Sequence, residues 1–517
     1  MIRATIPGLI RFAAGGAAAL AAAFWLPLAA DDPLHGTLLV LPIVLAGLAE
    51  FDARARAAGA RAIPRRISAW QLTIAGALVL AALLRPHLGL HERSAAIVMA
   101  GFVLLLAHRL LRELIRLRPL LGSRLPRHPS TLFLLLPFLA YLALLPWSTE
   151  RRPPDGDEPY YLLITHSLAY DLDAELTDEY EEGAWRSFMN RPLEPQPGDP
   201  VGPHGELYSR HNALLPLALA LPYRLGGKMA ALLGMALLAA GLAWSTLALA
   251  YHYLPDRPGE TLLAYGLTAF LSPLLLYSYQ VWVEVPAALL ATLALSQILA
   301  LRQRRLSRTL VWGPRQWWGI ALPILLLPLV KIRFMLLAGP LVALAWWHAG
   351  RPRKPLIVLA VLLVVVGGGV LLHNQMLYGN PLKIHHWQEL ELHHYGLGAY
   401  AEGTFGLFWD AAFGLFGSFP VWLLLLPAVV LTLVRRQRLL LHLLVLTGPY
   451  LLIVVPRSEW YGGWSPPFRY ALVALPLLAL ILAPLLAHRR RGGARALSSG
   501  LLLLTLGLTL VWVAVPG

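Results

Sequence analysis

The sequence of 517 residues contains no cysteine. Disulfide bonds, thiolate nucleophiles and cysteine-ligated metals are therefore excluded. Charged residues are also scarce, at 14% of the chain, whereas 57% of the residues are hydrophobic and the mean hydropathy is +0.61. A soluble protein of this length needs more polar surface, so we expect lipid to be the solvent for much of the chain.

Several common catalytic and binding motifs are missing as well. The sequence has no phosphate-cradling P-loop, no zinc-protease helix motif and no hydrolase nucleophile elbow. The net charge of +15 could indicate nucleic-acid binding. The arginines, however, lie in short segments between apolar runs, as membrane orientation requires, so no nucleic-acid partner is expected.

Apolar runs of about 18–20 residues recur along the whole chain, and each is long enough to cross a bilayer. They predict an all-α, polytopic membrane protein. The first run follows Met1-Ile2-Arg3 and ends near Ala29-Ala30; it could be a signal peptide, but another apolar run follows at once and we expect a retained helix. The predicted spans are 8–30, 34–50, 68–84, 95–111, 131–147, 228–251, 261–279, 283–301, 317–330, 334–349, 356–373, 418–434, 439–455, 468–487 and 498–515.

The distribution of arginine predicts the orientation. With the N-terminus in the cytoplasm, alternate loops collect most of the 43 lysine and arginine residues, which satisfies the positive-inside rule. Three sizeable segments are then outside: 148–227, 374–417 and 456–467. Within this plan, 317–349 is predicted to form two short helices joined outside at Lys331-Ile332-Arg333. The alternative is one long tilted helix with snorkelling cations.

The outer segment 148–227 is unusually acidic, with 14 of the 28 acidic residues of the chain. Most of these acids are expected to form a solvated face: Asp171, Asp173, Glu175, Asp178, Glu179, Glu181 and Glu182.

The start of this segment has a different character. Asp157-Glu158-Pro159 follows the span 131–147, and apolar positions after it suit a helix lying on the bilayer. Pro159 fits the first turn of that helix, and Asp157 or Glu158 could be its N-terminal cap. The other interpretation is catalytic: a carboxylate at the lipid interface can accept a proton from a nucleophile that attacks a lipid-borne electrophile.

A lipid-phosphate leaving group would need nearby cations. The predicted topology places six candidates on the outer face, each of which could also be an anchor for lipid headgroups: Arg210, His211, Lys331, Arg333, Arg457 and Arg469. Glu284 lies at the outer end of a span, where acidic residues are functional by default.

Other residues are candidates for substrate binding. The segment 459–470 combines Gly-Gly and Pro-Pro pairs with aromatic residues, which suits a shaped loop that contacts sugars, although an aromatic belt at the interface has the same composition. The segment 374–417 carries four histidines, 385, 386, 393 and 394, without convincing metal-ligand spacing. No cofactor is therefore expected, and no motif supports a divalent metal. The predicted contacts are Tyr161, Tyr378, Trp460, Tyr461 and Trp464.

Asp157-Glu158-Pro159 at the start of the first large outer segment resembles the GT-C membrane glycosyltransferases. The likeness is greatest to the protein O-mannosyltransferase and lipid A aminoarabinose transferase group, and it covers about residues 131–487. Further pieces in the same order are similar to bacterial members: Tyr208-Ser209-Arg210-His211, Glu284-Val285-Pro286, Tyr378-Gly379-Asn380-Pro381 and Trp460 to Tyr470.

The resemblance implies a sugar donor on a polyprenyl phosphate and transfer outside the bacterial cytoplasmic membrane, usually with inversion. By position, Asp157 would be the general base, and Glu158 would support it or orient the acceptor, which could be a lipid, a glycan or a protein. Arg210 lies where relatives often place a lysine near the donor phosphate, although His211-Asn212 replaces their usual Pro-Pro.

The sequence therefore divides into an N-terminal transmembrane extension (1–130), a GT-C-like catalytic module (131–487), and a cytoplasmic basic segment with a last span (488–517). The extension is unlike the minimal plan of the family. Two other functions fit the composition: a lipid or sugar-lipid transporter, which would bury ionisable residues near mid-membrane in repeated halves, and a non-catalytic subunit of an envelope-assembly complex.

Overall fold

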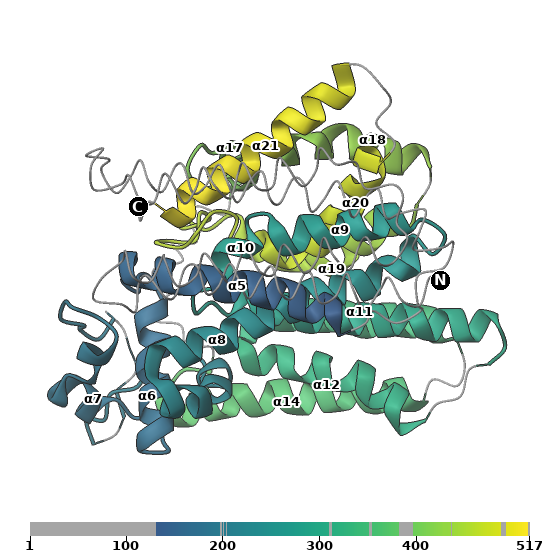
Figure 1. Ribbon diagram of the computed structural model, residues 1–517. Coiled ribbons are helices and arrows are strands. Elements are labelled where there is room, and N and C mark those ends of the chain that lie inside the picture. Colours follow the sequence, from purple (N-terminus) through teal and green to yellow (C-terminus); the bar gives the residue numbers. More distant parts are fainter. Residues whose placement is uncertain are drawn as a thin grey trace, which may run out of the picture.

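The computed structural model describes residues 131–514 apart from 197–198, 200, 203, 310–312, 351–353, 382–395, 436 and 488–492, and apart from the side chains of 146–151, 378 and 493–495. The N-terminal extension and its four predicted spans lie outside the described residues. The described chain is helical with connecting turns and loops (Figure 1). It has two isolated β-bridges but no β-strand in this part, which confirms the all-α prediction.

The first half of the described chain builds one end of the molecule and the helices that lead away from it. Its helices are α5 (Leu132–Arg151), α6 (Glu158–Tyr170), α7 (Thr177–Glu182), the 3-10 turn η1 (Ala184–Ser187), α8 (Leu214–Tyr253), α9 (Pro258–Phe270), α10 (Leu274–Tyr277) and α11 (Glu284–Leu306).

The second half completes the bundle. Its helices are α12 (Pro314–Val330), η2 (Ile332–Phe334), α13 (Met335–Ala349), α14 (Lys354–Tyr378), α16 (Leu397–Trp409), α17 (Leu415–Ser418), η4 (Pro420–Leu424), α18 (Leu425–Val434), α19 (Leu439–Val454), η5 (Tyr470–Ala474), α20 (Leu475–Ala487) and α21 (Gly493–Ala514).

Six helices of the described chain are long and apolar enough to cross a membrane. A seventh span is formed if the bent pair of 420–434 and 439–454 counts as one. The chain is therefore a multi-pass helical membrane protein. The six are Leu214–Tyr253, Glu284–Leu306, Ile332–Ala349, Lys354–Leu377, Tyr470–Ala487 and Ala496–Val513.

The break between α12 and α13 confirms one detailed prediction. Helix α12 ends at Val330, and Lys331 has extended backbone angles (φ −162°, ψ 136°) before the short turn η2. The two helices are thus joined at Lys331-Ile332-Arg333, and the alternative of one long tilted helix is wrong. The hydrogen bond from Arg333 to Glu284 places this break beside the start of α11.

Two predicted boundaries differ from the structure, and one is confirmed. Helix α8 is broken at Gly226 and Gly227, whose backbone angles are non-helical, so the predicted outer segment 148–227 ends at this break and the predicted span 228–251 follows it. The predicted span 261–279 is interrupted after Phe270, where α9 ends and Leu271 is extended. The segment 374–417 contains helix α16, while its residues 382–395 lie outside the described part.

Helix α6 also differs from the predicted bilayer-surface helix. Pro159 does occupy its first turn, but nine of its 13 residues are buried, because the helix packs against α8. A helix on a bilayer surface would expose one polar face. Instead, the packing of α6 against α8 fixes the position of Asp157, the residue at its N-terminus.

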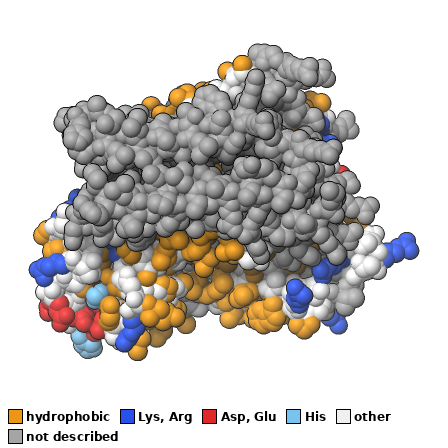
Figure 2. Space-filling view, in the orientation of Figure 1, with side chains coloured by type: hydrophobic (Ala, Val, Ile, Leu, Met, Phe, Trp, Pro, Cys, Tyr) orange, Lys and Arg blue, Asp and Glu red, His pale blue; other side chains and the backbone are white. Residues whose placement is uncertain are grey.

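The surface has the polarity of a membrane protein. Figure 2 shows a band of hydrophobic side chains between two ends that carry charge, with acidic side chains gathered at the end where Figure 1 places α7. Helix α14 contributes exposed residues such as Val361, Val364 and Leu372. Arg304 and Arg305 lie in the last turn of α11, at the opposite end of the bundle. The bundle therefore separates an acidic end from a basic end.

This arrangement predicts that the two ends react from opposite faces of the membrane. Because the chain has no cysteine, single cysteines can be labelled without background. Glu181→Cys in α7 and Gln303→Cys near the end of α11 replace exposed residues. In sealed vesicles of one orientation, a membrane-impermeant maleimide should label one of these variants, and the other only after permeabilisation. Labelling of both in sealed vesicles would contradict the topology.

Candidate functional site

Asp157 and Arg469 form the centre of a cluster of charged side chains at the acidic end of the bundle. Asp157 occupies the N-cap position of α6, but its side chain makes no capping hydrogen bond. Its Oδ2 instead accepts a hydrogen bond from Nη2 of Arg469. The Asp157 side chain is 22% exposed and the Arg469 side chain only 5%. The capping interpretation of Asp157 is therefore wrong, and its carboxylate faces a buried guanidinium.

Glu284 extends the cluster deeper into the protein. It begins α11 and is fully buried. One carboxylate oxygen, Oε1, accepts hydrogen bonds from Arg333 (2.5 Å) and from Nε of Arg469 (3.1 Å). Arg469 also donates from Nη1 to the carbonyl of Gly462 at 2.8 Å. A buried carboxylate is tolerated when it is paired in this way, so Glu284 holds both arginines in place.

Aromatic rings support the guanidinium groups. The Arg469 guanidinium lies 4.2 Å from the ring centre of Trp282, and the Arg333 guanidinium lies 4.9 Å from that of Tyr470. Arg457 contacts the same Tyr470 ring at 5.7 Å. Cation–π contacts of this kind restrict the orientation of a guanidinium. The aromatic frame therefore leaves the arginines little rotational freedom.

Lys331 completes the cluster without a direct partner. Among the residues that the structure describes, its ammonium group has no hydrogen bond or ion pair. Burial, with a further contribution from Arg333, lowers the pKa of Lys331 to about 7, although Asp157 acts in the opposite direction. Burial alone would raise the pKa of Asp157, but Arg469 and Lys331 hold that pKa well below its usual value.

The charges do not balance within the cluster. Three cations, Lys331, Arg333 and Arg469, face two carboxylates, Asp157 and Glu284. Protonated Lys331 therefore gives the cluster one excess positive charge. An excess cation in a partly buried environment is stabilised by an anion, so the arrangement is suited to binding a singly charged anionic group.

His211 and Arg210 lie beside this cluster but have different roles. Nε2 of His211 is 4.0 Å from Oδ1 of Asp157 and 3.0 Å from the side-chain oxygen of Gln196. Burial lowers the pKa of His211 well below its usual value. The Arg210 guanidinium donates to Asp199 at 3.0 Å. His211 is therefore a neutral neighbour of Asp157, while Arg210 is held by a carboxylate of its own.

Glu158 contacts a different part of the chain from its neighbour Asp157. Its Oε1 accepts the backbone N–H of Val281 at 3.1 Å, and the side chain is buried. Burial raises the pKa of Glu158 to about 7, opposed mainly by Arg152 and Lys228. This contact joins the start of α6 to the turn before α11. The predicted role of Glu158, to support Asp157 or to orient the acceptor, stays a prediction.

The loop 456–467 is shaped by glycine. Gly462 has φ +94°, and a Cβ atom there would lie 2.8 Å from Cδ of Arg469. Gly156 has φ +60°, and a Cβ atom there would lie 3.0 Å from the Trp282 ring and 3.5 Å from the carbonyl oxygen of Trp464. L side chains are strained at such positive φ angles. Both glycines therefore allow loops to close over Arg469 and Trp282.

The predicted aromatic contacts are only partly gathered here. The Tyr161 ring lies 4.5 Å from that of His211, and its buried hydroxyl has no hydrogen-bond partner among the described residues. Trp460 and Tyr461 pack against each other at 5.7 Å, whereas Trp464 is 76% exposed. The Tyr378 side chain and the four histidines of 382–395 lie outside the described residues.

An apolar pocket of about 170 Å³ lies between helices α8, α11 and α12. It is lined only by apolar residues of α8, α11 and α12, among them Leu214, Pro286 and Val330. Val330 directly precedes Lys331 in the chain, and Pro286 is two residues beyond Glu284. A hydrocarbon chain in this pocket could therefore extend from an anionic group at Lys331.

Sequence reasoning missed several residues of this site. Trp282 and Tyr470 flank the arginines, although both lie within or beside the segments that carry the family resemblance. Asp199, which holds Arg210, and Gln196, which contacts His211, carry no local signal because both lie in a proline-rich loop. Proximity to Glu284 in the sequence could have indicated Trp282.

No protein-family model, curated protein or solved structure matches this chain. The assignment as a multi-pass membrane protein therefore rests on the apolar helices, and any function has to be argued from the charged cluster.

Glu158 gives a test of the loop-positioning contact. Glu158→Gln keeps an acceptor for the Val281 N–H and removes a buried charge, whereas Glu158→Ala leaves that N–H unpaired at a cost of about 1–3 kcal/mol. With a pKa of about 7 in the folded protein and a lower one when unfolded, the Glu158 carboxyl loses its stabilising contribution as the pH rises from about 4.5 to about 7.

At about pH 8 we therefore expect the melting temperature of Glu158→Gln to equal or exceed that of wild type, and that of Glu158→Ala to be lower. Differential scanning fluorimetry of the purified variants measures both. A destabilised Gln variant with an unaffected Ala variant would refute the assigned contact.

Proposed function

We propose that this protein is a glycosyltransferase that moves a sugar from a polyprenyl-phosphate-linked donor to an acceptor, with Asp157 as the general base. One observation carries the proposal. The Asp157 carboxylate is hydrogen-bonded to Arg469 and lies within the electrostatic influence of Lys331, so a base lies beside an excess of positive charge. Val330, which directly precedes Lys331 in the chain, lines an apolar pocket that could hold a hydrocarbon chain. The resemblance of the segments around Asp157, Glu284 and Arg469 to GT-C enzymes supports the same assignment.

The donor has chemistry that matches these features. A polyprenyl-phosphate sugar is a phosphodiester with one negative charge and a long apolar tail. Lys331 supplies the excess positive charge, and the pocket beside Val330 has room for a segment of the tail. Arg333 and Arg469 are placed to stabilise the charge that grows on the phosphate as its bond to the sugar breaks.

In the proposed reaction, the acceptor oxygen attacks the anomeric carbon, and the bond from this carbon to the phosphate oxygen breaks. The electron pair of that bond stays on the departing polyprenyl phosphate, and the acceptor proton moves to Asp157. In the resting protein the low pKa of Asp157 makes it a weak base. A donor phosphate that attracts Arg469 would weaken the Asp157–Arg469 pair, so donor binding would raise the pKa of Asp157 and activate it.

The proposed location is the extracytoplasmic side of a bacterial cytoplasmic membrane. Arginines concentrate at the end of the bundle opposite to the site, and the positive-inside rule assigns that end to the cytoplasm. The partners would be the lipid-linked donor, surrounding membrane lipids and a lipid, glycan or protein acceptor. The maleimide labelling of Glu181→Cys from the outside provides the corresponding test.

Replacement of the proposed base tests the mechanism. Loss of a general base lowers the rate by roughly 10²–10⁴. Asp157→Asn should therefore lower kcat by this factor, measured as release of polyprenyl phosphate from a panel of polyprenyl-phosphate sugars. Folding should be retained, because Arg469 keeps its bonds to Glu284 and to the Gly462 carbonyl.

Asp155→Asn is the matched control. Asp155 lies two residues away in the same loop, but its side chain is 39% exposed and pairs with the exposed Arg191, so its substitution should leave kcat within about twofold because such pairs contribute little. Wild-type turnover in Asp157→Asn would refute the proposed base. Movement of the donor across the membrane without release of its phosphate would indicate a transporter instead.

We expect donor binding to depend on pH through the titration of Lys331. Its ammonium form, which attracts phosphate, is present below its pKa of about 7 and is lost above it. Since the donor phosphodiester keeps one charge throughout, its Kd should increase about tenfold from about pH 6 to about pH 8. Lys331→Met should bind weakly at both pH values. A wild-type Kd that is independent of pH, or a pH dependence that persists in Lys331→Met, would contradict this role.

A further inference from the structure

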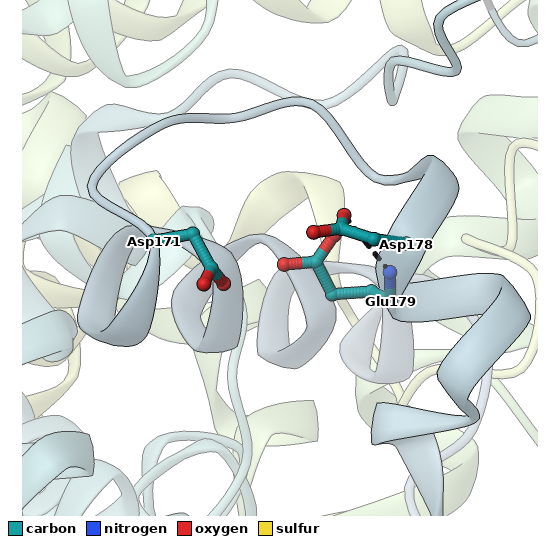
Figure 3. Close-up of side chains that lie close together, drawn as sticks. All are labelled: Asp171, Asp178 and Glu179. Atoms are coloured by element: carbon teal, nitrogen blue, oxygen red, sulfur yellow. Dashed lines mark hydrogen bonds between the residues drawn. The ribbon is translucent and has the colours of Figure 1, made fainter.

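A second group of acidic side chains lies at the other end of α6. Asp171 is the C-cap of α6, and Asp178 and Glu179 belong to α7. One carboxylate oxygen from each residue lies within 4.8 Å of those of the other two. Figure 3 shows the three carboxylates facing a common space between the two helices. Three negative charges at this separation repel one another unless a cation or a proton neutralises them.

Glu179 distinguishes this group from an ordinary solvated face. The sequence predicts that Glu179 is exposed with its acidic neighbours, but the prediction is wrong, because its side chain is only 3% exposed. Neither of its carboxylate oxygens has a hydrogen-bond partner in the described part of the chain. A buried carboxylate without a partner requires compensation by a ligand or a proton.

The ligand atoms determine the kind of ion. All three groups offer carboxylate oxygen, which suits hard divalent cations such as calcium, whereas zinc prefers nitrogen and sulfur ligands. The remaining coordination positions of a calcium ion are accessible to water, because Asp171 and Asp178 are exposed. We propose that Asp171, Asp178 and Glu179 bind a calcium-like divalent cation that fastens α7 to the end of α6.

This site is separate from the charged cluster at Asp157. Asp157 and Asp171 flank opposite ends of the 13-residue helix α6, which spans about 20 Å at the rise of an α-helix. The cation would therefore stabilise the acidic segment and, through α6, the position of the helix that carries Asp157. It would take no part in the proposed sugar transfer, and its binding does not depend on that proposal.

Calcium titration of the purified full-length protein tests the site. After removal of metals with a chelator, addition of CaCl₂ should raise the melting temperature by roughly 2–5 °C. Isothermal titration calorimetry should give saturable binding with a Kd of about 10⁻⁵–10⁻³ M. MgCl₂ should have a weaker effect, because magnesium requires a stricter geometry.

Variants distinguish the site from general screening of an acidic surface. Glu179→Gln removes one of the three ligand carboxylates but keeps the shape of the side chain, so it should be as stable as the calcium-free wild type or more so, and its melting temperature should not respond to calcium. Glu181→Gln is the matched control on the same helix; Glu181 is exposed and lies outside the group, so its calcium response should equal that of wild type. Asp178→Asn is a second variant and should bind at least tenfold more weakly.

Two results would overturn the proposal. The first is the absence of saturable calcium binding up to about 10 mM, which is about tenfold above the weakest Kd of known protein sites. The second is an equal response in Glu179→Gln, Asp178→Asn and wild type, which would indicate screening of surface charge. Asp157→Asn should bind calcium as wild type does, because Asp157 lies at the other end of α6. The calcium site and the proposed transferase activity are therefore tested separately.

Discussion

The pairing of a fully buried carboxylate, Glu284, with two arginines is the interaction on which the rest of the site depends. An isolated ion in a low-dielectric interior is costly, and removal of one partner from a buried pair typically costs about 3–5 kcal/mol. Glu284 therefore requires Arg333 and Arg469 near the first turn of α11. This requirement brings together the break between α12 and α13, the loop at Gly462 and the start of α11.

Asp157 and Lys331 differ from this buried pair because both are partly exposed. They lie where the interior cluster reaches the surface, so a ligand can contact them without disrupting Glu284. The cluster therefore combines guanidinium groups in fixed positions with two ionisable side chains that a ligand can reach. Glu284 and the rings of Trp282 and Tyr470 hold the guanidinium groups, while Lys331 and Asp157 would change protonation or partner in the proposed reaction. Such preorganised charge is the main source of electrostatic catalysis.

The two ends of α6 show how environment separates residues of one type. At its start, the adjacent acids Asp157 and Glu158 have pKa values shifted in opposite directions, because one faces guanidinium and the other faces a backbone N–H in a buried loop. Near its other end, in α7, Glu179 is buried while the neighbouring Asp178 is exposed. The acidic composition of this segment is therefore not uniform in function: one carboxylate faces cations, one positions a loop, and three surround a common space.

The sequence by itself determined the helical membrane class, because apolar length is a local property of each segment. It also predicted the break at Lys331, since basic segments on both sides of 317–349 favour two crossings, and the extended backbone of Lys331 then excluded a single tilted helix. Tertiary structure alone decided the partners of the charges. Arg469 contacts Glu284 and Asp157 across 185 and 312 positions of the chain, and Glu158 contacts Val281 across 123. Spacing along the sequence does not encode such contacts. Capping by Asp157 and exposure of Glu179 were therefore reasonable predictions that only the packing of α6 and α7 overturned.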